Sequence, residues 1–135
     1  MRVLPIGLLA IAVAITVAAP GEAQTVQAPQ AFRPCAACHE VGPNARHQVG
    51  PTLNGVHGAR AGAKPAFRYS RAMNGAGVGG LIWNDATLDA YLTNPRAFLP
   101  GNRMAFGGMP DAGERAAVIR FLAGLPDQPL PQKPV

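Results

Sequence analysis

The sequence has few of the residues that usually build a hydrophobic core. Its 135 residues include only eight aromatic side chains (five Phe, two Tyr and one Trp), against 16 Gly and 14 Pro. A small domain of this composition needs an additional stabilising group inside it. With only two cysteines, any disulfide within the chain would close a loop of two intervening residues. A large apolar cofactor is therefore the better candidate for the missing core.

Several patterns that indicate function are also absent. There is no dense run of basic residues, so the net charge of +5 does not indicate nucleic acid, and an acidic protein partner fits it better. No internal repeat is present. The glycine-rich segment Gly75–Gly80 follows no strand and lacks the lysine of a phosphate-binding loop, so it is expected to be a flexible loop. No small-molecule substrate is indicated.

The N-terminal segment has the pattern of a signal peptide. Arg2 is followed by an uncharged, mostly apolar run over residues 3–21. Gly21-Glu22-Ala23 then gives the small-x-small pattern of a cleavage site. We expect residues 1–23 to be removed on export to the periplasm. The alternative is an uncleaved membrane anchor through the same apolar run, which is just long enough to span a bilayer.

Two helices are indicated by their start and stop signals. One begins at Asn84 or Asp85 and ends before Pro95, because the residue before a proline avoids the helical conformation. The other begins at Asp111, which resembles the first residue of a capping box. It ends at Gly124, because glycine is common at the C-terminal ends of helices.

The rest of the chain has weaker signals. An N-terminal helix over residues 32–39 is expected to be kinked by Pro34. Residues 41–80 are predicted to form loops with at most short helical turns. No segment has the pattern of a strand. The sequence therefore predicts a mostly helical domain over residues 24–125, followed by a proline-rich, disordered tail over residues 126–135.

The pattern Cys35-Ala36-Ala37-Cys38-His39 carries the strongest chemical signal. Cys-x-x-Cys-His is the attachment pattern of c-type haem. The two thiols add to the two vinyl groups of one porphyrin, and the turn between them places the following imidazole under the iron. One nitrogen of His39 would bind iron, and the other would donate a hydrogen bond that fixes the ring.

Three other uses of these cysteines are weaker. A thioredoxin-like redox pair would need a βαβ setting, which the sequence does not indicate. A structural zinc site needs four ligands. His47 and His57 are available beside Cys35 and Cys38, but their spacing is outside that of zinc fingers. A disulfide between the two cysteines would close only a very small loop.

Three methionines downstream are candidates for a second axial ligand of the haem iron. Methionine usually fills gaps in a core, so each also has a packing interpretation. Met104 follows Pro100-Gly101-Asn102-Arg103, a rigid and non-helical approach that can present its sulfur to a fixed point. Met109 is the second candidate. Met73, beside the glycine-rich segment, is the weakest.

With these motifs in order, the sequence resembles the class I c-type cytochromes, small electron carriers of mitochondria and the bacterial periplasm. The resemblance covers residues 32–125. The motifs that carry it are Cys35-Ala36-Ala37-Cys38-His39, Gly50-Pro51-Thr52-Leu53-Asn54-Gly55, Phe67-Arg68-Tyr69-Ser70, Trp83, Thr87-Leu88, Tyr91-Leu92-Thr93-Asn94-Pro95 and Pro100-Gly101-Asn102-Arg103-Met104-Ala105-Phe106. It implies a fold of about three main helices and long loops around one covalently attached haem c.

The resemblance also implies roles for residues near the iron. Met104 would be the distal ligand, and the carbonyl of Pro51 would accept the hydrogen bond from His39. Tyr91 would lie near the Met104 sulfur. His47 would tether neighbouring loops and would not bind metal.

Around the haem periphery, the resemblance places Tyr69 and Trp83 at the propionates. Phe106 would cover the haem edge. Arg96 and Arg103 fall where the family has lysines that dock acidic redox partners.

The sequence departs from the family pattern at four places. The N-terminal helix is short, holds two prolines and lacks the usual glycine contact with the last helix. Ala59 stands where the family has a buried arginine at a propionate, and Arg60 comes one residue late. Asn102 stands where threonine is usual. The loop that includes Gly75–Gly80 is longer than in the shortest members.

The resemblance thus implies a monomeric, monohaem one-electron carrier and not an enzyme, with His39 and Met104 as axial ligands. One alternative is a haem subunit fixed in an oxidase or dehydrogenase complex. Another is a haem peroxidase or gas sensor with an exchangeable sixth ligand.

Overall fold

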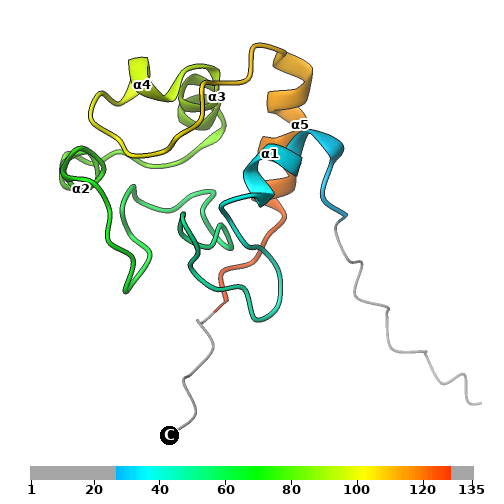
Figure 1. Ribbon diagram of the computed structural model, residues 1–135, viewed down its shortest axis with the longest axis horizontal. Coiled ribbons are helices and arrows are strands. Elements are labelled where there is room, and N and C mark those ends of the chain that lie inside the picture. The colour runs from blue at the N-terminus through cyan, green and yellow to red at the C-terminus, as the bar shows by residue number, and fades with distance from the viewer. Residues whose placement is uncertain (1–26, 129–135) are drawn as a thin grey trace, which may run out of the picture.

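The computed structural model describes residues 27–128 and is mostly helical with long loops (Figure 1). The elements in chain order are a 3-10 helix η1 (Gln30–Phe32), α1 (Arg33–Ala36), α2 (Arg71–Val78), α3 (Asp85–Thr93), α4 (Pro95–Phe98) and α5 (Ala112–Ala123). Within the described residues there is no strand, and the β pairing is limited to a single bridge between Arg60 and Ile82. The mostly helical fold expected from the sequence is confirmed.

The core forms where α3, α5 and the N-terminal helices meet. The 3-10 helix η1 packs against α5, and α3 lies beside the N-terminal half of α5 (Figure 1). Phe32 and Phe121 meet edge to face with ring centroids 4.9 Å apart, the geometry that aromatic quadrupoles favour. Val118 of α5 and Leu88 of α3 are buried in the same cluster.

The two helices expected from the sequence begin at the predicted caps. Asn84 accepts the amide of Thr87, whose hydroxyl accepts the Asn84 amide in return, so α3 starts with a reciprocal capping box. Asp111 accepts the amide of Glu114 at 2.8 Å and caps α5. Each such cap stabilises its helix by about 1 kcal/mol.

The end of α3 is also as predicted, but the chain does not enter a loop there. Asn94, the residue before Pro95, leaves the helical conformation. Its side chain then accepts the amide of Ala97 and caps the short helix α4. Pro95 occupies the first turn of α4, where its missing N–H is not needed. The same dipeptide therefore ends one helix and starts the next.

The prediction of loops over residues 41–80 is wrong for its last part, because Arg71–Val78 forms the helix α2. Ser70 caps this helix by accepting the amide of its third residue. Gly77 allows α2 to pack closely, since a Cβ there would lie 2.1 Å from the carbonyl oxygen of Ala61. The glycines of Gly75–Gly80 thus serve helix packing and a helix end, and the flexible loop expected there is not found.

The N-terminal helix expected over residues 32–39 is divided into two short elements. Pro29 precedes η1, and Pro34 falls in the first turn of α1. A proline is tolerated in a first turn and not in a helix interior. Pro34 therefore starts a new helix instead of kinking a longer one, and α2 takes the place of the N-terminal helix among the three longest helices.

The chain after α5 folds back onto the loops. The carbonyl of Leu125 accepts the amide of Gly55 at 3.1 Å, and Asp127 forms an ion pair with Lys64 at 2.5 Å. The segment 126–135, expected to be a tail, thus begins with residues that make specific contacts. Residues 129–135 lie outside the described part of the chain.

The predicted signal peptide, or anchor, also lies outside the described residues. Between residues 27 and 128, no helix has both the length and the apolar character needed to cross a bilayer.

Candidate haem site

The cysteine motif lies on α1 and the turn that continues it. The amides of Cys38 and His39 both donate to the carbonyl of Cys35, at 3.0 and 2.9 Å. Residues three and four apart on such a turn lie on the same side, so the two thiols and the imidazole share one face. Neither cysteine is bridged, and burial raises the pKa of the Cys35 thiol.

The His39 ring is fixed by the backbone of the next loop. Its Nδ1 lies 2.6 Å from the carbonyl oxygen of Pro51. A carbonyl only accepts, so Nδ1 carries the proton and Nε2 keeps the lone pair that a metal requires. Burial lowers the pKa of His39 and outweighs the Pro51 hydrogen bond, which raises it. The predicted contact with Pro51 is confirmed, and it holds the neutral tautomer suited to ligation.

Gly50 is a further residue of this site, and no role was predicted for it. Its amide donates to the carbonyl of Cys38 at 2.9 Å. A Cβ at this position would lie 2.3 Å from Cε1 of His39, well inside van der Waals contact. The backbone at Gly50 therefore forms the surface against which the imidazole lies.

Met104 is positioned by the side chain of Asn102. The Met104 amide donates to Asn102 Oδ1 at 2.9 Å. Asn102 Nδ2 donates in turn to the carbonyls of Pro95 and Leu99, at 2.9 and 2.8 Å. The asparagine that departs from the usual threonine thus uses its acceptor and its donor to join the Met104 loop to α4.

Tyr91 points toward the Met104 sulfur, as the resemblance implied. Its hydroxyl lies 3.9 Å from Sδ of Met104 and 3.5 Å from Oδ1 of Asn102. Its ring is buried against Trp83, with centroids 4.9 Å apart. Burial raises the pKa of Tyr91 to about 12, so the hydroxyl remains a hydrogen-bond donor at neutral pH.

The Tyr91 phenol makes stability fall with pH in the alkaline range. Its pKa is about 12 in the folded protein and about 10 in an unfolded chain. The folded state therefore holds the proton more tightly, and stability present below about pH 10 is lost as pH rises toward 12. We expect a loss of about 3 kcal/mol across this window. Urea unfolding followed by circular dichroism at several pH values measures it, and an equal slope in Tyr91→Phe would contradict the assignment.

The other two methionines are placed in packing roles. Met109, the second candidate, is buried in the core with 4% of its surface exposed, and its amide donates to the carbonyl of Leu92 at 2.8 Å. Met73 lies on α2 and packs against the edge of the same core. Both fit the usual role of methionine as a gap filler, which leaves Met104 as the methionine held beside a polar network.

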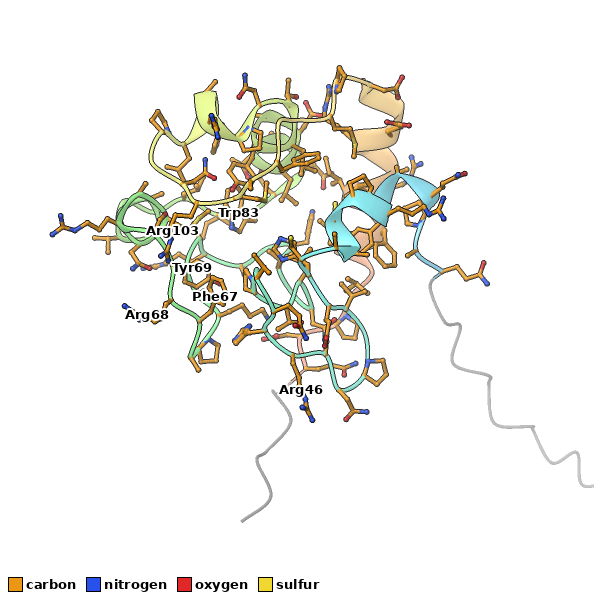
Figure 2. The ribbon with its side chains drawn as sticks, in the orientation of Figure 1. Arg46, Phe67, Arg68, Tyr69, Trp83 and Arg103 are labelled. Carbon is orange, nitrogen blue, oxygen red and sulfur yellow. The ribbon has the colours of Figure 1, made fainter. Side chains whose placement is uncertain are left out.

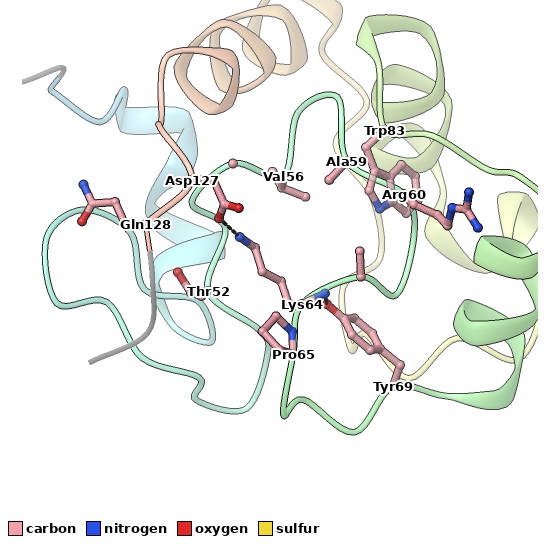
Figure 3. Close-up of a pocket in the computed structure, with 12 residues that line it drawn as sticks. Thr52, Val56, Ala59, Arg60, Lys64, Pro65, Tyr69, Trp83, Asp127 and Gln128 are labelled. Carbon is pink, nitrogen blue, oxygen red and sulfur yellow. Dashed lines mark hydrogen bonds and ion pairs between the residues drawn. The ribbon is translucent and has the colours of Figure 1, made fainter. Parts of the chain in front are cut away.

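Tyr69 and Trp83 line one cavity of about 360 Å³, shown in Figure 3. Trp83 is buried, and the hydroxyl of Tyr69 accepts the backbone amide of Lys64 at 3.2 Å. Burial raises the pKa of Tyr69. Phe106 is half-buried against the core. The cavity joins two hydrogen-bonding side chains to apolar walls, which suits a carboxylate on a hydrophobic ring system.

His47 joins two loops through both of its ring nitrogens. Nε2 lies 2.8 Å from the carbonyl oxygen of Pro65, and Nδ1 accepts the amide of Thr52 at 3.2 Å. Both nitrogens are therefore used in hydrogen bonds. The predicted tethering role is confirmed, and this geometry does not suit a zinc ligand.

The donor set of the site fits a covalently bound haem. Two neighbouring thiols can form thioethers, His39 offers Nε2, and Met104 offers a sulfur whose contact with Tyr91 is long. Among residues 27–128 there is no group of three His, Cys, Asp or Glu side chains that could hold a metal ion. Imidazole and thioether are the axial pair of electron-carrying cytochromes c.

Comparisons with known proteins agree with this fit. No protein-family model matches the chain. Cytochrome c2 of Rhodomicrobium vannielii is 42% identical over 123 residues, which is 91% of this chain and 96% of that protein. Cytochrome c2 of Afifella marina is 45% identical over 101 residues, 71% of this chain and 82% of that protein. The structure of cytochrome c2 from Rhodospirillum centenum matches with a TM-score of 0.68 and 37% identity, over 72% of this chain and 93% of that one.

The chain belongs to the class I c-type cytochromes. This cytochrome carries one covalently bound haem c and transfers single electrons between redox protein partners. It is an electron-transfer protein and not an enzyme. Bacterial cytochromes c2 are periplasmic carriers, in agreement with the export predicted from the first residues.

Proposed function

We propose that His39 and Met104 are the axial ligands of the haem iron, and that both stay bound in each oxidation state. The observation that carries the proposal is the hydrogen-bonded support of both ligands. His39 is fixed by Pro51, and Met104 is fixed through Asn102. The ferric optical spectrum tests it: the weak far-red band of methionine-ligated haem is expected, and high-spin haem that binds cyanide on mixing would contradict it.

The same support of both ligands favours fast electron transfer. The haem supplies an iron that gains and loses one electron. The protein keeps the ligand positions constant, because the loops of His39 and Met104 are each bound to neighbouring backbone. The buried rings of Trp83 and Tyr91 help to exclude water from the site. A thioether ligand and a dry surrounding both favour ferrous iron, so a raised reduction potential is expected.

This function also requires export of the protein, which we assign to the N-terminal segment. We assign residues 1–23 to a cleaved signal peptide and Gln24 to the start of the mature protein. The small-x-small pattern before Gln24 and the membership of the family both support this. Haem attachment and function would then take place in the periplasm.

Partner docking is assigned to exposed arginines beside the Met104 loop. Arg96 lies on α4 and Arg103 immediately precedes Met104, and both are exposed. The Arg103 guanidinium donates to the carbonyl of Arg68, so a third exposed arginine lies close by, as Figure 2 shows. Arg68 was not predicted as a docking residue. Arg96 belongs to the same region, because Asn102, the residue before Arg103, donates to the carbonyl of Pro95, the residue before Arg96. These three arginines would attract an acidic partner and orient it at encounter.

Charge reversal at this surface should slow electron transfer in a salt-dependent way. In Arg96→Glu/Arg103→Glu, we expect reduction by an acidic partner to be slower by at least about tenfold at low ionic strength. The difference should shrink at high salt, because the Debye length falls to about 3 Å at 1 M. Stopped-flow rates over a range of salt concentrations measure this.

Charge reversal on another part of the surface gives the control. Arg120 is exposed in the last turn of α5, and Arg46 is exposed on a loop that lies well away from Arg68 and Arg103 in Figure 2. Arg120→Glu/Arg46→Glu therefore changes the net charge by the same amount outside the docking surface. We expect this variant to lose less rate than the first. Equal losses would mean that net charge, and not a local surface, governs the encounter.

A further inference from the structure

The cavity of Tyr69 and Trp83 also contains the side chain of Lys64. Figure 3 shows it extending across the cavity from the loop beside Tyr69 toward Asp127. Only 12% of the Lys64 side chain is exposed, whereas Asp127 is 74% exposed. The cationic partner of this pair is therefore the one placed inside.

The other lining residues bring little positive charge to the middle of the cavity. Ala59 contributes only a methyl group. The guanidinium of Arg60 extends past Trp83, away from Lys64, in Figure 3. An ammonium carries three N–H donors, and the one hydrogen bond that the described residues make to Lys64 Nζ is that of Asp127. A mostly buried cation with a single, exposed partner is costly unless another anion is present.

The position of Asp127 is built into the fold. The amide of Gly55 donates to Leu125, which directs the chain after α5 toward the cavity. A Cβ at Gly55 would lie 2.4 Å from Cβ of Asp127, and Gly55 also has a φ of +63°. Glycine is therefore needed there both for the backbone conformation and for the close approach of Asp127. The segment after α5 forms one wall of the cavity.

We propose that Lys64 is the internal cation that neutralises a haem propionate in this cavity. Asp127 offsets part of the positive charge of Lys64 and so lowers the reduction potential of the haem. The proposal rests on the placement of propionates at Tyr69 and Trp83. Reduction adds one negative charge to the haem, so a nearby cation favours the ferrous form and a nearby anion opposes it. In a cavity partly closed to water, such interactions are stronger than at the surface.

The two members of the pair should therefore shift the potential in opposite directions. Lys64→Gln removes the cation, so the potential is expected to fall. Asp127→Asn removes the anion and leaves an uncharged amide of the same size, so the potential is expected to rise. In Lys64→Gln/Asp127→Asn the two shifts should largely cancel. Spectroelectrochemical titration of the purified holoprotein measures all three.

Asp89→Asn is the matched control. Asp89 pairs with Arg115, a mostly buried cation, at 2.7 Å, but neither residue lines the cavity. We expect this variant to lose stability with a smaller change of potential than Asp127→Asn. A purely structural role of the Lys64–Asp127 pair would lower stability in both single variants without shifts of opposite sign.

The possible results separate the proposal from the axial ligation. Unchanged potentials, or shifts of the same sign, with the far-red band intact would overturn the role of Lys64 and leave ligation by Met104 standing. Absence of that band in the unmodified protein would instead overturn the ligation. If Lys64→Gln yields no holoprotein, Asp127→Asn still decides: a raised potential supports the proposal, and an unchanged or lowered one contradicts it.

Discussion

Replacing Met104 with alanine is expected to abolish the weak far-red band of the ferric cytochrome and to lower its reduction potential. Alanine has no donor atom, so the iron loses the thioether that stabilises its ferrous state. The neighbouring Tyr91 hydroxyl and Asn102 side chain are unchanged by the substitution. The optical spectrum and a redox titration of the variant measure the two effects.

The same variant should acquire an exchangeable coordination position. Cyanide is expected to bind ferric Met104→Ala on mixing, and the unmodified protein only slowly, which stopped-flow absorbance distinguishes. The fold should persist, because Asn102 accepts a hydrogen bond from the backbone amide of residue 104, which alanine keeps. We expect a loss of about 2 kcal/mol in stability from the missing side chain.

Met109→Leu is the control for a general effect of losing a methionine. Met109 is buried in the core, and a change of similar volume there costs less than about 1.5 kcal/mol. The far-red band should remain. Loss of the band in Met109→Leu, or its persistence in Met104→Ala, would show that the distal ligand has been assigned to the wrong residue.

The parts of the fold that the sequence predicts correctly depend on local signals. Asn84 and Asp111 cap the helices that they were expected to cap, since a cap involves residues only three apart. The Cys-x-x-Cys-His pattern is local in the same way, because a single turn fixes its geometry. Pro51 and Tyr91 were placed through the resemblance to a family, and the structure has both at the expected contacts.

The parts that were missed depend on contacts between distant residues. The glycines of α2 have low helix propensity. Glycine is needed at position 77 because a side chain there would collide with the carbonyl of Ala61 in another loop. Lys64 and Asp127 are 63 positions apart, so no local pattern joins them. In the sequence, Asn102 is a departure from the family pattern. Its role in joining the Met104 loop to α4 depends on hydrogen bonds to the carbonyls of Pro95 and Leu99, which only the structure shows.

The second large effect is expected at Gly50, on the proximal side of the haem. In Gly50→Ala, the new methyl group would lie 2.3 Å from Cε1 and 2.6 Å from Nδ1 of His39. The imidazole must then move, and its hydrogen bond to Pro51 is lost or weakened. We expect the free energy of unfolding to fall by about 3 kcal/mol, as measured by guanidinium unfolding of the holoprotein.

The reduction potential of Gly50→Ala is a second measurement, and a simple loss of stability would not change it. A hydrogen bond from Nδ1 makes a ligating imidazole more basic, and a more basic ligand favours ferric iron. Loss of the Pro51 contact in Gly50→Ala should therefore raise the potential, opposite to the effect of Met104→Ala. An unchanged potential in a folded Gly50→Ala protein would mean that the His39 ring keeps its hydrogen bond.

Gly107→Ala supplies the matched control on the Met104 loop. A Cβ at Gly107 meets no atom within 4 Å, so the methyl group has room. Its effect on stability should stay within about 0.5 kcal/mol, with the potential unchanged. Similar losses in the two variants would mean that the glycines act through chain flexibility. A loss confined to Gly50→Ala would mean that close contact between this backbone and the imidazole is what the site requires.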